Sequence, residues 1–272
     1  MCSSRGLVNL KNSRYPASSQ SVTASESFGW AKRLSQFSSW IFFAVAALSV
    51  VLLLIEDQRI GVVIQPVLIV ASIAGIGLSL LTQNLQNRGN RAQRAIQFTN
   101  SLGVPMGENA RENYFNSDLP PSLARLAATT FENTFFTTAV LCKMLFWERI
   151  RGGVYLLIFM FLMAARWPTL PWLLFLAQTL FSSDVALHWL RMECFCSRVA
   201  RVKDRLHQFF LQGGDVTRHE GLAVLLTAFT DYECAKDEAA MPLDEKAFRR
   251  LNPSSSKKWN RLRVQLKIDA AS

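Results

Sequence analysis

The sequence predicts an all-α membrane protein: two transmembrane helical hairpins (four spans), a helical cytosolic middle region and a helical C-terminal tail. Three observations support this class. Half of the 272 residues are hydrophobic, and only 18% are charged, whereas a typical soluble domain has about 25% charged residues. The apolar residues form long runs without the alternation of a strand. The cations, which give a net charge of +10, lie almost entirely outside those runs.

The first predicted segments are a tail and a hairpin. Residues 1–38 are rich in Ser, carry five cations and lack apolar periodicity, so we expect a disordered basic tail. Hairpin 1 (39–82) contains an uncharged run of 16 residues, Trp40–Ile55, and one of 22, Ile60–Leu81. As helices these measure roughly 24 and 33 Å, against a hydrocarbon core of about 30 Å. The polar residues 56–59 between them suit a turn in water.

Small residues recur on one face of the second predicted span. Ala71, Gly75 and Ser79 are four residues apart, a spacing that lets helices approach closely in lipid. Contact with the first span of the same chain is favoured over a subunit interface, and both interpretations stay open.

The cytosolic region (83–151) opens with Arg88, Arg91 and Arg94, three residues apart on a predicted helix. They suit a continuation of the span that contacts lipid headgroups, or a nucleotide-binding site that holds phosphate groups. Further on, Pro120, Pro121 and Ser122 predict a helix start.

Hairpin 2 (152–190) has two apolar runs separated by Pro168 and Pro171, which suit a tight turn. A re-entrant pair in place of two full spans is the alternative. If the amino terminus is cytoplasmic, only Arg59 and Arg166 face outward, leaving 28 of the 30 Lys and Arg residues inside. Both termini are therefore predicted to be cytoplasmic.

The last segment (191–272) is predicted to be a helical stalk and tail. From Val185 onward, apolar residues recur after one step of seven in alternating steps of three and four, which predicts a packing seam within the chain or between subunits. The seam comprises Val185, Met192, Phe195, Val199, Val202, Leu206 and Phe209. The remaining tail predicts three short helices, broken at Pro242 and Pro253.

Catalytic and metal-binding motifs are not found in the sequence, so we expect no enzyme, no cofactor and no metal site. The five cysteines include Cys194 and Cys196, which with His188 or His207 would be the nearest approach to a zinc site. On a helix, however, residues two apart point about 200° away from each other. Reduced structural thiols are the favoured interpretation.

Two segments resemble the SMODS-associating four-transmembrane effectors, a bacterial family. They are "RAQRAIQFTNSLGVP" through "NYFNSDLPPSLARLAATTFENTFF", and the tail "FTDYECAKDEAAMPLDEKAFRRLNPSSSKKWNRLR". The resemblance implies an antiphage effector of the inner membrane that responds to a cyclic oligonucleotide from a partner nucleotidyltransferase. It further implies a homo-oligomer that disrupts the membrane, as a pore-forming protein would, and does not bind nucleic acid polymers. The alternative is a non-pore membrane anchor or sensor that recruits a cytosolic partner through the C-terminal helices.

Overall fold

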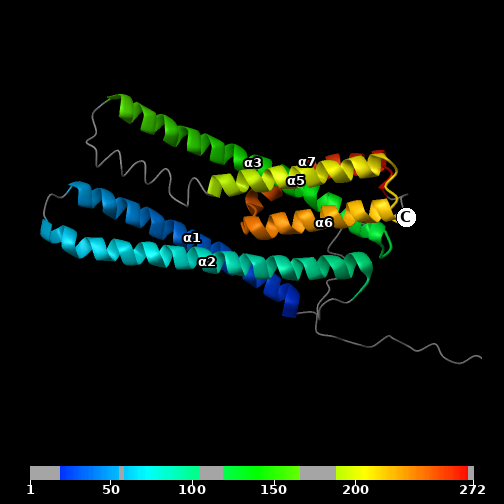
Figure 1. Cartoon of the computed structure of the whole chain (residues 1–272), viewed down its shortest axis with the longest axis horizontal. Coiled ribbons are helices and arrows are strands. Elements are labelled where there is room, and N and C mark those ends of the chain that lie inside the picture. Colours follow the sequence, from blue (N-terminus) through cyan, green and yellow to red (C-terminus); the bar gives the residue numbers. More distant parts are fainter. Residues whose placement is uncertain (1–18, 55–57, 105–118, 166–187, 269–272) are drawn as a thin grey trace, which may run out of the picture.

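The computed structural model describes residues 19–54, 58–104, 119–165 and 188–268, and every regular element in these ranges is a helix (Figure 1). The all-α class is therefore confirmed. The helices are α1 (Ser19–Leu54), α2 (Gln58–Leu102), α3 (Leu123–Ala165), α5 (His188–Leu211), α6 (His219–Ala239) and α7 (Glu245–Gln265).

Helices α1 and α2 form a long antiparallel hairpin along one side of the molecule (Figure 1). Their half-buried residues recur at steps of three and four, as in a coiled coil. We call these residues the hairpin seam. On α2 the seam includes Leu68, Ala71, Gly75 and Leu78. Near the other end of α2, a Cβ added to Gly89 would lie 2.6 Å from the Phe28 ring of α1, so the two helices touch there.

The start of α1 differs from the predicted disordered tail, because residues 19–38 are helical. The Ser and Ala residues of this segment are compatible with a helix. Phe28 and Ala31 also supply buried contacts at the hairpin seam, and Ala31 is fully buried. Packing against α2 therefore stabilises a segment whose composition alone favours disorder.

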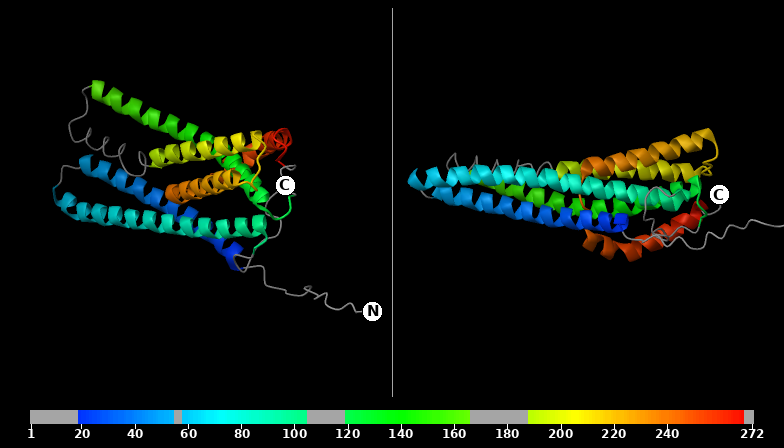
Figure 2. Two further views of the ribbon diagram at one scale, coloured as in Figure 1. Left: turned by 45° about the vertical axis from the view of Figure 1, so that its right-hand side comes forward. Right: turned by 90° about the horizontal axis from the view of Figure 1, so that it is seen from below.

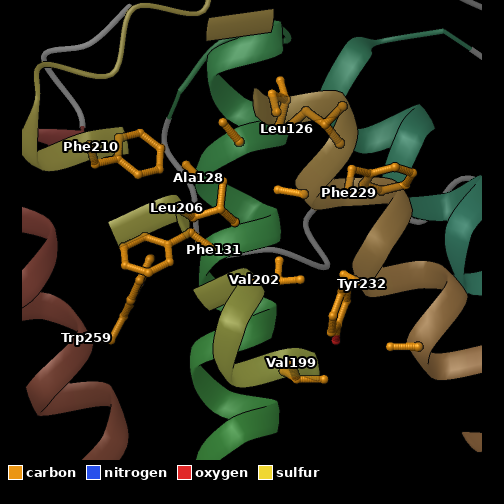
Figure 3. Packing of buried hydrophobic residues seen from close by; sticks show 14 of the residues in the cluster. Leu126, Ala128, Phe131, Val199, Val202, Leu206, Phe210, Phe229, Tyr232 and Trp259 are labelled. Atoms are coloured by element: carbon orange, nitrogen blue, oxygen red, sulfur yellow. The ribbon is translucent and has the colours of Figure 1, made fainter. Parts of the chain in front are cut away.

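The second half of α2, the first half of α3, and α5, α6 and α7 enclose the hydrophobic core. Phe131 of α3 lies at its centre, with its ring centroid 5.6 Å from Phe210 and 5.3 Å from Trp259 (Figure 3). The structure describes six of the residues that the sequence assigned to a seam. Five of them are buried, namely Met192, Phe195, Val199, Val202 and Leu206. Phe209 is half-buried, and its neighbour Phe210 is buried instead. Their contacts are made within the chain, as the intramolecular interpretation requires. Val185 lies outside the described residues.

Two of the predicted helix boundaries are confirmed. The Ser122 hydroxyl accepts a hydrogen bond from the Arg125 N–H at 3.2 Å and caps the start of α3. The chain also leaves helical structure between α6 and α7, where Pro242 lies. Ala240 there adopts a left-handed conformation with φ 44°, and the Asp244 carboxylate caps α7 by accepting from the Lys246 N–H at 2.9 Å.

The predicted break at Pro253 is wrong, because α7 continues through it. Proline costs one hydrogen bond inside a helix, but the burial of Trp259 further along α7 compensates. The Trp259 side chain is 4% exposed. Packing of one large aromatic residue thus outweighs the local helix-breaking tendency.

Outward-facing apolar side chains gather at the end of the molecule where α1 joins α2 and α3 approaches Ala165, the left side of Figure 1. They include Trp40, Phe43, Val62, Val70, Ile73, Leu156, Leu157 and Phe161, each at least 55% exposed. The opposite end is the packed bundle, and Figure 2 shows how the helices of the two ends are arranged from two further directions. An exposed apolar surface of this kind indicates contact with a membrane or with another protein.

Within the described residues, one helical segment, Val62–Leu102, is long and apolar enough to cross a membrane. It contains most of the second predicted span. The first and third predicted spans fall in α1 and α3, and the fourth, Trp172–Leu190, lies almost wholly outside the described residues. The four-span topology stays a prediction.

The close packing of the first turn of α6 against the α5–α6 connection depends on a glycine. A Cβ added to Gly221 would lie 2.0 Å from the Asp215 carbonyl oxygen, a distance that requires the backbone to move. We expect Gly221→Ala to lower the free energy of unfolding by about 2 kcal/mol. Gly29→Ala is the matched control, because a Cβ there meets nothing within 4 Å and the helix propensity of Ala should make it neutral or stabilising. Equal denaturation midpoints for the two variants would contradict this packing.

Helices α3 and α5 place two thiols together, with the Cys142 and Cys196 sulfur atoms 3.8 Å apart. Burial, then the adjacent Cys142, raises the pKa of Cys196 to about 11, so its thiol is protonated at neutral pH. We expect mild oxidation by oxygen and copper phenanthroline to join the two as a disulfide, seen as the loss of two hydrogens from a peptide pair. Cys196→Ser should abolish the link, whereas Cys194→Ser, at an exposed position on the same helix, should preserve it.

Candidate functional site

The α1–α2 hairpin contacts the rest of the helical bundle through polar side chains of α2. Gln86, Asn90, Arg94 and Gln97 recur at steps of four and three and so share one side of the helix. We call these four residues the docking face. Gln86 donates to the Met241 carbonyl at 3.4 Å, and Gln97 donates to the Thr130 hydroxyl at 3.3 Å. The docking face therefore bridges α2 to α3 and to the end of α6.

An ion-pair cluster lies at the centre of this contact. The Arg94 guanidinium lies 2.9 Å from Glu233 (Nε to Oε2) and 2.6 Å from Asp237 (Nη2 to Oδ2), both on α6. Lys236 is also within 3.1 Å of the Glu233 carboxylate. Asn90 donates to the Asp237 carboxylate at 3.2 Å. Two cations and two carboxylates thus balance each other between two helices.

The cluster is shielded from water on the Glu233 side. Only 3% of the Glu233 side chain is exposed, compared with 29% for Arg94. Burial alone would lower the pKa of Arg94, but its hydrogen bonds to Asp237 and Glu233 outweigh burial and raise that pKa. Arg94 therefore stays charged, and the Glu233 carboxylate depends on it and on Lys236 for compensation.

Several buried polar atoms around the docking face have no hydrogen-bond partner among the described residues. On α2 they are Gln86 Oε1, Asn87 Oδ1, Asn100 Nδ2 and Ser101 Oγ, and Thr129 Oγ1 is a further example on α3. A buried polar atom without a partner costs about 1–3 kcal/mol, which solvation by water would recover. The α2 contact is therefore less favourable for its size than the apolar packing among α3, α5 and α6.

Apolar packing between α2 and α6 is correspondingly limited. Phe98 and Phe229 bring their ring centroids to 4.8 Å. Phe98 is half-buried, whereas the fully buried apolar residues of the bundle come mainly from α3, α5 and α6. The packing thus separates a well-packed body of α3, α5, α6 and α7 from a hairpin that is held to it mostly by polar groups.

The three arginines predicted to bind a nucleotide have different surroundings. Arg88 and Arg91 are exposed on α2, whereas Arg94 is turned toward α6 and pairs with Glu233 and Asp237. The three side chains spread around α2 because each step of three residues rotates by about 300°. An anion bound by all three would have to compete with the carboxylates for Arg94.

The acidic partners of Arg94 were not found in the sequence. Glu233 and Asp237 are four residues apart, so they share a side of α6. That spacing indicates a paired acidic site. It does not identify Arg94 as the partner, because the ion pair joins positions 139 residues apart.

Cys194 and Cys196 point apart, as expected for two residues of one helix separated by a single position. Cys196 is buried toward Cys142, and Cys194 is exposed. Among the described residues, no group of His, Cys, Asp and Glu side chains is arranged to hold a metal ion.

No known protein family, curated protein or solved structure matches this chain.

Proposed function

We propose that the protein is a multi-pass effector of the bacterial inner membrane, with four spans and both termini in the cytoplasm. In this proposal a cyclic oligonucleotide releases the α1–α2 hairpin from the cytosolic bundle, and the released form oligomerises and disrupts the membrane. The observation that carries the proposal is the ion-pair cluster between Arg94 on α2 and Glu233 and Asp237 on α6.

Membrane insertion is supported by the separation of surfaces. The first half of α2 exposes Val62, Val70 and Ile73. The second half, beyond Thr82, is polar and contacts other parts of the bundle. Both halves belong to one helix. A movement at the docking face is therefore transmitted directly to the apolar segment.

The ligand class is supported because a phosphate group would compete with the Glu233 and Asp237 carboxylates for Arg94. A cyclic oligonucleotide presents several phosphodiester anions, and arginine binds phosphate and carboxylate oxygens with the same geometry. Arg88 and Arg91 are exposed and available for a first contact. A phosphodiester that then took Arg94 from Glu233 and Asp237 would remove the main charged contact between α2 and α6.

The energetics are compatible with an equilibrium between a docked and a released α1–α2 hairpin. A ligand shifts an equilibrium only by binding the two states differently, and here the free Arg94 exists only in the released state. Release also returns the unsatisfied Gln86 Oε1 of the docking face to water. The cost of separation is consequently smaller than for an apolar interface of similar extent.

Leakage of a dye from proteoliposomes tests the proposal. We expect leakage from vesicles containing the inserted protein when a cyclic oligonucleotide is added, and little without it. Absence of leakage with every cyclic oligonucleotide tried, despite correct insertion, would contradict the effector and favour a membrane anchor.

The double variant Glu233→Gln/Asp237→Asn tests the mechanism separately. It removes both carboxylates that hold Arg94, so we expect leakage without ligand. The matched control is Asp231→Asn/Glu238→Gln, which changes the same number of charges on the same helix at exposed residues that pair with Arg205 and Arg198 of α5. Leakage from both variants, or from neither, would overturn the role of the Arg94 cluster.

A further inference from the structure

The start of α7 lies at the level where the apolar surface of the molecule begins. The Asp244 N–H lies 3.4 Å from the Met144 sulfur on α3, and the following residues Phe146 and Trp147 are more than half exposed. On the other side, Lys32 of α1 lies 3.8 Å from Glu245. The connector before α7 thus lies beside α1 and α3, at the boundary between the packed bundle and the exposed apolar surface.

Cations from three helices gather at this boundary. We call them the basic collar, and they are Lys32, Arg33, Lys143, Lys246, Arg249 and Arg250, all exposed. Lys143 lies over the Phe146 and Trp147 rings, 5.7 and 5.9 Å from their centroids.

Few acidic side chains neutralise the cations of the basic collar. Glu245 pairs with Lys32 and Arg249, and Asp244 caps α7. Other charged residues at this level are already paired with each other: Arg149 with Glu193, and Arg151 with Glu148. The collar therefore keeps a net positive charge.

Exposed apolar side chains accompany these cations. Leu243 and Phe248 flank the start of α7 and are 40% and 41% exposed. Phe248 is in turn 6.2 Å from Phe136 on α3, which fixes the position of this first turn against the bundle. Cations beside exposed apolar side chains are the combination found where proteins meet a membrane surface.

We infer that the basic collar binds the anionic phospholipid headgroups of the cytoplasmic leaflet, and that the α6–α7 connector rests on that surface. The inference rests on the proposed membrane insertion. A lipid surface suits this arrangement better than a compact ligand, because the exposed cations are distributed over three helices, α1, α3 and α7.

The far end of α7 serves as an internal comparison. Trp259 packs against Phe131, whereas Asp244 packs against Met144, so α7 runs antiparallel along α3. Trp259 also packs against Phe135, so the two contacts lie nine to thirteen residues apart on α3, which is about 14 to 20 Å along the helix axis. Lys257, Lys258 and Arg261 are therefore beyond the reach of headgroup charge, which salt screens within about 10 Å.

The experiment compares two triple variants of the full chain. Lys246→Gln/Arg249→Gln/Arg250→Gln removes three collar cations, and Lys257→Gln/Lys258→Gln/Arg261→Gln removes three exposed cations from the far end of the same helix. Each protein is reconstituted in phosphatidylcholine vesicles that contain spin-labelled phosphatidylglycerol or spin-labelled phosphatidylcholine. The fraction of motionally restricted lipid gives the preference for the anionic headgroup.

We expect the collar variant to lose roughly fivefold or more of its preference for phosphatidylglycerol, since each cation near an anionic surface is worth about fivefold in affinity. The far-end variant should match the unaltered protein. The charge-conserving variant Lys246→Arg/Arg249→Lys/Arg250→Lys should retain the preference, which separates loss of charge from loss of folding.

Equal losses in the two neutralised variants, or no loss in the collar variant, would overturn the collar as a lipid site. A collar variant that kept its lipid preference but lost affinity for a cyclic oligonucleotide would overturn it in favour of a soluble anion. If no spin-labelled lipid of either kind is restricted, the protein is not inserted, and the proposed function fails with it.

Discussion

Replacing Arg94 with Gln is expected to lower the free energy of unfolding by about 3 kcal/mol, the usual cost of removing one partner of a buried ion pair. The Glu233 side chain is 3% exposed and would keep only Lys236 as a charged partner. Chemical denaturation in detergent, followed by circular dichroism, measures the change.

Arg91→Gln is the control for this substitution. Arg91 lies one turn before Arg94 on the same helix but is exposed, so its replacement should change the free energy of unfolding by no more than about 0.5 kcal/mol. The double variant Arg94→Gln/Glu233→Gln should recover part of the loss, since the unpaired buried charge is then gone. An Arg94→Gln variant as stable as Arg91→Gln would show that the ion pair does not hold α2 to α6.

Replacing Trp259 with Ala is expected to destabilise the protein by about 3–5 kcal/mol, the range found for loss of a buried aromatic residue. Trp259 is 4% exposed and packs with Phe131 at 5.3 Å and Phe135 at 5.7 Å. Apart from Trp259, the one fully buried residue of α7 is Ser255. The helix should therefore leave the bundle when the indole is removed.

Limited digestion with trypsin detects that release, because α7 is rich in Lys and Arg. We expect cleavage after Lys257, Lys258 and Arg261 to become fast in Trp259→Ala and to stay slow in Val264→Ala, whose side chain is 76% exposed on the same helix. Similar digestion of the two variants would contradict an α7 anchored by Trp259.

Local patterns predicted the elements whose stability is decided locally. The apolar periodicity of α5 identified residues that are buried, and the Pro-Pro-Ser sequence marked the start of α3. Both features depend on neighbours in sequence. The all-α class followed from the same kind of pattern.

Features decided by distant contacts were missed. Residues 19–38 are helical because α2 packs against them, and α7 continues through Pro253 because Trp259 reaches the core of α3. The surroundings of Arg94 depend on residues 139 and 143 positions away. Composition and spacing do not specify such pairings, since any exposed carboxylate of the chain would satisfy an arginine equally well in the unfolded state.

The length of α2 gives the docking face mechanical leverage. Its 45 residues form one continuous helix that includes Pro66 near the far end. Arg94 lies near the other end, so about 54 Å of helix extends from it to Gln58 and only about 12 Å to Leu102. Pivoting the helix by about 10° at Arg94 would swing its far tip through about 9 Å, roughly the width of a neighbouring helix. A change confined to a few hydrogen bonds is thereby converted into a displacement as large as the spacing between packed helices.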